Sequence, residues 1–195
     1  MDRLPTLIIA FVAAVGCDST SSGSKDGGRV AKVEAAKAED PAKAAAKWCD
    51  VLHEPDAAKA FSYPALASGS GVEGKARWVN VWATWCKPCI EELPRIEKFR
   101  EKLGNDGAQL EVQLLAADAA PEFDAFVAEN AAAKGSLRLA DPDGVAAWVG
   151  SLGLEENAGL PLHLFVDGDN RLRCARLGGV GNDDYAEVLA VARSL

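Results

Sequence analysis

Methionine, histidine and net positive charge are scarce in this 195-residue chain, and long apolar runs are missing. It has one methionine and two histidines, His53 and His163, which are far apart in sequence. This disfavours metal sites built from thioether and imidazole ligands. A membrane-spanning helix needs about 20 apolar residues, and the longest apolar run, residues 4–15, is far shorter. The net charge is −8 with no basic stripe, so no nucleic acid partner is expected.

The apolar run at residues 4–15 has the length of the core of a secretory signal. It ends in Ala-Val-Gly before Cys17, and a Ser/Gly-rich polar stretch follows at once. A small residue, a cysteine and a polar tail resemble a bacterial lipoprotein signal, in which Cys17 is lipidated after cleavage. The alternative is an ordinary signal peptide in which Cys17 is incidental. Both readings predict export, and the first adds a lipid anchor in the membrane.

Three segments follow from the composition. We expect a lipoprotein signal peptide over residues 1–16 and a flexible tether over residues 17–47. The tether is first rich in Ser, Gly and Asp and then mixes Ala with alternating charges, so it offers no wide apolar face. A folded domain is expected over residues 48–195.

Within that domain, runs of β-branched and apolar residues alternate with helical patterns. The patterns predict a β-α-β-α-β-α-β-β-α order with one hairpin near the end. This order is typical of an α/β fold with a mixed central sheet flanked by helices. The strands are expected at 77–83, 110–116, 137–139, 162–166 and 171–177, and the helices at 91–103, from Pro121, at 145–152 and at 183–195.

Two cysteines, Cys86 and Cys89, are three positions apart where the first predicted strand gives way to a helix. The unpaired N–H groups and dipole of a helix N-terminus favour an anion. A thiolate at Cys86 is such an anion, so its pKa should fall below the free value of about 8.5. Cys86 could then attack a disulfide and Cys89 could resolve the mixed disulfide. Half a zinc site is the alternative, but Cys49 and Cys174 are isolated, so no metal is expected.

The cysteines sit in the run Val-Trp-Ala-Thr-Trp-Cys-Lys-Pro-Cys-Ile-Glu-Glu-Leu-Pro over residues 81–94. This run resembles the TlpA/ResA-like thiol-disulfide oxidoreductases of the thioredoxin superfamily, and the similar order of elements extends from about residue 58 to the C-terminus. The resemblance implies a thioredoxin-like fold. It also makes Pro161 the family's cis-proline facing the dithiol, and Glu92 a carboxylate near the thiols. Glu92 has two readings, a proton acceptor for the cysteines or a solvated helix residue.

The same resemblance assigns supporting roles around the pair. Trp85 is expected to shield the dithiol, while Lys87 and Pro88 lie between the cysteines, where Lys87 could tune the reduction potential. His163 is read as structural. Some TlpA-like proteins carry a second, structural disulfide, and Cys49 and Cys174 suit it, although two separate buried thiols remain the alternative.

The resemblance implies a membrane-anchored enzyme outside the cytoplasm that reduces disulfides in exported proteins. It needs no cofactor and would draw electrons from a membrane donor of the DsbD/CcdA type, often in cytochrome c biogenesis. We expect it on the periplasmic side of a bacterial membrane, with inner and outer membrane both open. A disulfide oxidase or isomerase is the alternative enzyme, and a copper-handling or redox-sensing module of the same fold is the alternative outside catalysis.

Overall fold

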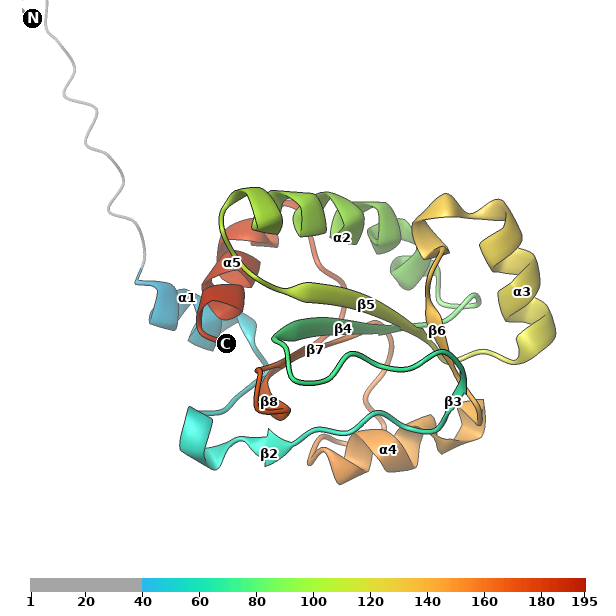
Figure 1. Ribbon diagram of the computed structural model, residues 1–195, viewed down its shortest axis with the longest axis horizontal. Coiled ribbons are helices and arrows are strands. Elements are labelled where there is room, and N and C mark those ends of the chain that lie inside the picture. The colour runs from blue at the N-terminus through green and yellow to red at the C-terminus, as the bar shows by residue number, and fades with distance from the viewer. Residues whose placement is uncertain (1–39) are drawn as a thin grey trace, which may run out of the picture. The chain divides into compact units, whose positions relative to one another are not determined.

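The computed structural model describes residues 40–195, and the expected signal peptide, Cys17 and most of the expected tether lie outside that range (Figure 1). Residues 40–195 contain a mixed eight-stranded sheet. Its strands are β1 (Val51–Leu52), β2 (Lys59–Ala60), β3 (Leu66–Ser68), β4 (Arg77–Trp82), β5 (Glu111–Ala116), β6 (Leu137–Leu139), β7 (Leu162–Val166) and β8 (Arg171–Leu177). The helices are α1 (Pro41–Trp48), α2 (Lys87–Asn105), α3 (Ala120–Glu129), α4 (Val145–Ser151) and α5 (Tyr185–Arg193).

The strands are ordered β1-β8-β7-β4-β5-β6-β3, and β2 also pairs with β8. β4, β5 and β6 are parallel, whereas β7 runs antiparallel to β4, and β8 runs antiparallel to β7. This is the mixed, thioredoxin-like sheet that the sequence predicts. Its central strands β4 and β7 are buried along their whole length, because helices cover both faces.

Alternation along β4 assigns its side chains to two separate cores. Val79 and Val81 face the core that contains Trp148 of α4. Trp78 faces the core shared with α1, α2 and α5, where it stacks on Phe165 of β7 with ring centroids 5.2 Å apart. Figure 1 shows α2 and α5 along one face of the sheet and α4 along the other. Full burial of a side chain such as Phe165 contributes about 1.5–3 kcal/mol.

The domain begins earlier than the sequence predicts, because residues 41–47 belong to α1 and not to a tether. Asp40 caps the helix, and its carboxylate accepts a hydrogen bond from the Ala42 N–H at 3.1 Å. Ala44 and Ala45 are buried, and α1 packs against α5. The alanines form only a narrow apolar stripe, so the sequence alone suggests an exposed segment. Their small size nevertheless lets two helices approach closely. Trp48 at the end of α1 supplies the larger apolar surface.

α2 is longer than the predicted helix over residues 91–103. It begins at Lys87 and continues through Gly104 to Asn105. Gly107, at φ 78°, is the left-handed residue that ends it, and the Ala108 N–H donates to the Leu103 carbonyl at 2.9 Å.

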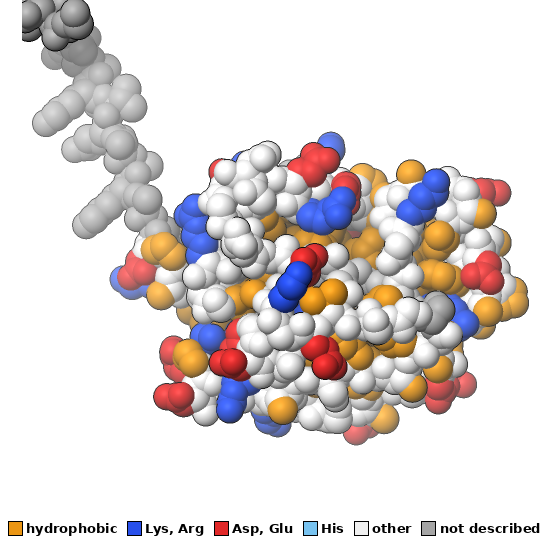
Figure 2. All heavy atoms as spheres, viewed as in Figure 1, with side chains coloured by type: hydrophobic (Ala, Val, Ile, Leu, Met, Phe, Trp, Pro, Cys, Tyr) orange, Lys and Arg blue, Asp and Glu red, His pale blue; other side chains and the backbone are white. Residues whose placement is uncertain are grey.

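Among residues 40–195, none of the helices has both the length and the apolar character that a membrane span requires. On the face shown in Figure 2, acidic and basic side chains are interspersed.

Candidate active site

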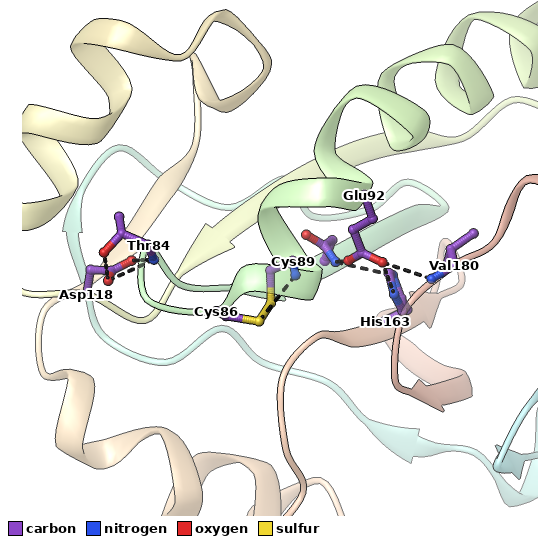
Figure 3. The surroundings of a disulfide bond; sticks show 8 residues. Thr84, Cys86, Cys89, Glu92, Asp118, His163 and Val180 are labelled. Carbon is purple, nitrogen blue, oxygen red and sulfur yellow. Dashed lines mark hydrogen bonds and ion pairs between the residues drawn. A yellow bond between two sulfur atoms is a disulfide. The ribbon is translucent and has the colours of Figure 1, made fainter.

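Cys86 and Cys89 lie at the junction of β4 and α2 and form a disulfide, with Cα atoms 5.3 Å apart (Figure 3). Cys86 is the N-cap of α2, and its Sγ accepts a hydrogen bond from the Cys89 N–H at 3.3 Å. Cys86 is 5% exposed and Cys89 is 0% exposed. The more accessible sulfur is therefore the one at the positive end of the helix, where reduction would place a stabilised thiolate.

The loop that delivers Cys86 is held by the buried carboxylate of Asp118, just beyond the end of β5. Both carboxylate oxygens accept from the Thr84 N–H at 3.0 Å, and Oδ1 also accepts from the Thr84 hydroxyl at 2.7 Å. β4 and β5 are parallel, so their carboxyl ends meet at one edge of the sheet. Asp118 is not among the predicted site residues, although its place after an apolar strand is the signal that could have identified it.

The outer rim of the dithiol carries Trp85, whose side chain is 71% exposed. Lys87 and Glu91 are also exposed and form an ion pair at 3.8 Å, a kind of surface contact that contributes little to stability. Pro88 lies in the first turn of α2, where a missing N–H costs no hydrogen bond. These residues flank the cysteines in sequence, and Trp85 exposes a large apolar surface.

The Leu160–Pro161 peptide bond is cis and lies immediately before β7. Leu160 packs against the apolar cluster that contains Cys86 and Cys89. The Pro161 carbonyl accepts from the Gly178 N–H at 2.9 Å, which ties this loop to the end of β8. The bond is therefore cis, as the family resemblance implies, and the residue before the proline lies against the dithiol cluster.

Glu92 is buried, with 1% of its surface exposed, so its reading as a solvated helix residue is wrong. Its Oε1 accepts from Asn80 Nδ2 at 2.9 Å, and its Oε2 accepts from the Val180 N–H at 2.8 Å. His163 Nε2 lies 3.4 Å from the same Oε2. Figure 3 shows the side chain leaving α2 one turn beyond Cys89 and reaching toward His163 and Val180.

His163 also belongs to this group, although the sequence predicts only a structural role for it. It pairs with Asn80 across β4 and β7, so the two side chains share a face of the sheet. The Trp78 indole N–H donates to His163 Nδ1 at 3.1 Å. Glu92, Asn80, His163 and Trp78 therefore form one buried polar network beneath the first turns of α2.

Cys49 and Cys174 form a second disulfide, with Cα atoms 5.7 Å apart and a sequence separation of 125. It joins the end of α1 to the middle of β8. Trp48, beside Cys49, lies over Phe165 with ring centroids 5.7 Å apart and near His163 at 6.5 Å. In the described residues 40–195 no three His, Cys, Asp or Glu side chains are grouped as a metal site.

Comparison with known proteins gives a family match over most of the chain. The family model described as Redoxin matches residues 37–189. The thiol:disulfide interchange protein CycY of Rhizobium leguminosarum is 30% identical over 139 residues, which are 71% of this chain and 69% of CycY. The thiol-disulfide oxidoreductase ResA of Bacillus thuringiensis is 38% identical over 48 residues, which are 25% of either chain. The match therefore spans only about a quarter of the length of curated relatives such as ResA.

Solved structures agree with the fold. The crystal structure of a DsbF homologue from Corynebacterium diphtheriae superimposes with a TM-score of 0.55. The alignment covers 74% of this chain and 92% of that one, at 20% sequence identity. At this identity the likeness shows that the two chains share a fold, and it carries no conclusion about substrates.

Proposed function

The chain belongs to the Redoxin family, within which it resembles the ResA-like proteins, and on this premise we propose that it is a thiol-disulfide oxidoreductase. Cys86 is the nucleophile and Cys89 the resolving cysteine. The observation that carries the proposal is the place of the two sulfurs: Cys86 caps α2 and is the more exposed, while Cys89 is sealed one turn behind it. Two further features support the proposal: the cis Leu160–Pro161 bond, whose leucine packs against the dithiol cluster, and the exposed Trp85 beside Cys86.

In the reducing direction the reaction has two exchange steps. The Cys86 thiolate attacks one sulfur of a substrate disulfide, forms a mixed disulfide and releases the other substrate sulfur as a thiolate. The Cys89 thiolate then attacks Cys86 Sγ, releases the second substrate thiolate and leaves the Cys86–Cys89 disulfide seen in the structure. Two electrons pass to the substrate, and the thiol protons end on the released substrate sulfurs or in solvent. Glu92, one turn beyond Cys89, is the proposed acceptor of the Cys89 proton.

Single-cysteine variants test these roles. Cys86→Ser should abolish the reduction of insulin disulfides, because the attacking sulfur is gone. Cys89→Ser should still attack and should accumulate mixed disulfides, which non-reducing gels detect. Near-normal turnover by Cys86→Ser would show that the nucleophile is assigned wrongly.

The direction of electron flow depends on the reduction potential of the Cys86–Cys89 pair. We propose a reductant, for which a value near that of thioredoxin, about −270 mV, is expected. A value near −120 mV, as in a strong oxidant, would instead favour the disulfide oxidase or isomerase reading. Equilibration with glutathione buffers, followed by thiol alkylation, measures it directly.

We further propose that the protein works outside the cytoplasm, held to the membrane through lipid on Cys17. An apolar segment before Cys17 supports the anchor, and a structural disulfide between Cys49 and Cys174 suits an oxidising compartment. Its partners would be exported disulfide-bearing proteins and a membrane dithiol donor of the DsbD/CcdA type, in a role such as cytochrome c biogenesis. Cys17→Ala should abolish incorporation of labelled palmitate and release the protein from membranes. Unchanged labelling would exclude Cys17 as the lipid site.

A further inference from the structure

His163 is a fully buried histidine, 0% exposed, within the polar network under the active-site helix. Its two ring nitrogens face different partners. Nδ1 faces Trp78 and Asn80 at 3.1 and 3.3 Å, and Nε2 faces Glu92 Oε2 at 3.4 Å without forming an aligned hydrogen bond. It therefore connects the carboxylate of Glu92, one helical turn beyond Cys89, with the centre of the sheet.

The partners of Nδ1 fix the form of the ring. An indole nitrogen can only donate a hydrogen bond, so Nδ1 must accept from Trp78 and carries no proton. The second amide hydrogen of Asn80 points to the same atom while its first goes to Glu92. The ring proton of neutral His163 is therefore on Nε2, on the side of the Glu92 carboxylate.

The surroundings leave no room for a proton on Nδ1. A charged imidazolium would need a proton on Nδ1, directly against the Trp78 N–H. Arg176 pairs with His163 across β7 and β8, which places a cationic side chain on the same face of the sheet. The guanidinium of Arg176 lies over the Trp48 ring, 5.7 Å from its centroid, and the Trp48 ring in turn lies near His163.

We propose that His163 is a positioning residue, fixed by Trp78 and Asn80 with its Nε2–H turned toward Glu92, which stabilises the charge of that carboxylate and thereby sets the pH dependence of the dithiol. This inference rests on the proposed function, in which Glu92 takes the proton of Cys89. His163 does not touch the sulfurs and acts only through Glu92.

Three N–H groups face the carboxylate: Asn80 on Oε1, with Val180 and His163 on Oε2. N–H donors stabilise negative charge on a carboxylate, and that charge opposes a thiolate nearby. Removing the His163 donor should weaken this opposition and ease thiolate formation. Without that N–H the carboxylate binds a proton more tightly, so less negative charge stands beside the forming thiolate.

The other titratable or charged groups around the carboxylate come from three elements. α2 supplies Cys86, Cys89 and Arg95, and the Arg95 guanidinium donates to the Val180 carbonyl. β7 supplies His163 and β8 supplies Arg176. Because the two arginines stay charged through neutral pH, they do not contribute to changes in the thiol profile between pH 5 and 9.

Two substitutions separate the two ends of the ring. His163→Asn places an amide near the Nδ1 position, so it keeps a partner for Trp78 but does not reach Glu92. His163→Gln places an amide near Nε2 and can keep the donor to Glu92. A donor to a charged group is strong enough to move a titration, so His163→Asn should lower the pH midpoint of Cys86 alkylation by about half a unit to one unit. Alkylation at pH 6 should then be about three- to tenfold faster, and His163→Gln should stay close to wild type.

The decisive comparison repeats His163→Asn in a Glu92→Gln background. If His163 acts through Glu92, it should shift neither the alkylation profile nor the reduction potential further there. Equal shifts in both backgrounds, or no shift in either, would overturn the proposal. If His163→Asn does not fold, His163→Phe removes the same donor while keeping the ring volume. Insulin reduction by the wild type, with Cys86→Ser as blank, reports separately on the proposed function, because its failure leaves the pH comparison intact.

Discussion

Removing the Cys49–Cys174 disulfide should lower the free energy of unfolding substantially. The bond closes a loop with a sequence separation of 125, and it ties α1 to β8. In the chain-entropy model, such a loop constrains the unfolded chain by about 5 kcal/mol at 25 °C. Cys49→Ala with Cys174→Ala should therefore lower the free energy of unfolding by about 3–5 kcal/mol, the lower figure applying if the unfolded state keeps structure.

The active-site pair provides a matched control within the same chain. Cys86 and Cys89 are only three residues apart, so the same model gives their disulfide about 2 kcal/mol. Urea unfolding followed by circular dichroism should be run on the oxidised wild type and on each double alanine variant. The variant lacking Cys49 and Cys174 should lose clearly more stability than the variant lacking Cys86 and Cys89.

The local consequence should appear in α1. With the bond gone, α1 is held to the domain by Trp48 and by its alanine contacts with α5, so its amides should lose protection in hydrogen exchange before those of α2. A loss of unfolding free energy below about 1 kcal/mol would refute the loop argument. Two alkylatable thiols at these positions, in protein purified without reductant, would refute the pairing itself.

Two further predictions concern the active site. Glu92→Gln should lower the pKa of Cys86, because a negative charge no longer opposes the thiolate, and should slow resolution by Cys89. The exposed Glu91→Gln should do neither, and coincident alkylation profiles for Glu92→Gln and wild type would exclude Glu92 from the chemistry. Asp118→Asn should destabilise the protein by about 1–2 kcal/mol and slow insulin reduction, because the loop through Thr84 loses a charged acceptor. Unchanged kinetics in a destabilised variant would give Asp118 a role in stability alone.

The order of the main elements can be predicted from sequence because each has a strong local pattern. The five predicted strands correspond to β4, β5, β6, β7 and β8, and the β-rich composition of β4 indicates a buried strand. The short strands β1, β2 and β3 are missed, since two or three residues carry no periodicity. α1 is missed for a different reason. Its buried face consists mainly of alanines, and the apolar surface that they bury depends on how closely α5 approaches.

The dithiol can be predicted from sequence because it consists of two cysteines three residues apart at the start of a helix, so no distant residue is needed to recognise it. The network behind it is not local. Asn80, Glu92 and His163 come from β4, α2 and β7, and only the antiparallel register that pairs Asn80 with His163 brings them together. A register one residue different would turn His163 to the opposite face of the sheet, toward α4.

That dependence on register explains why the second disulfide and the active site are linked in this fold. Cys174 pairs with Phe165 across β7 and β8, two residues from the pair that joins His163 to Arg176. The Cys49–Cys174 bond therefore anchors Trp48 over the same stretch of β7 that supplies the histidine facing Glu92. Because this stretch is covered by Trp48 and packed against Trp78, the imidazole stays out of water, and its proximity to the carboxylate is not screened by solvent. A variant that keeps Cys86 and Cys89 but lets water reach His163 would keep its nucleophile. The effect of His163 on the Glu92 carboxylate would then be weakened by solvent.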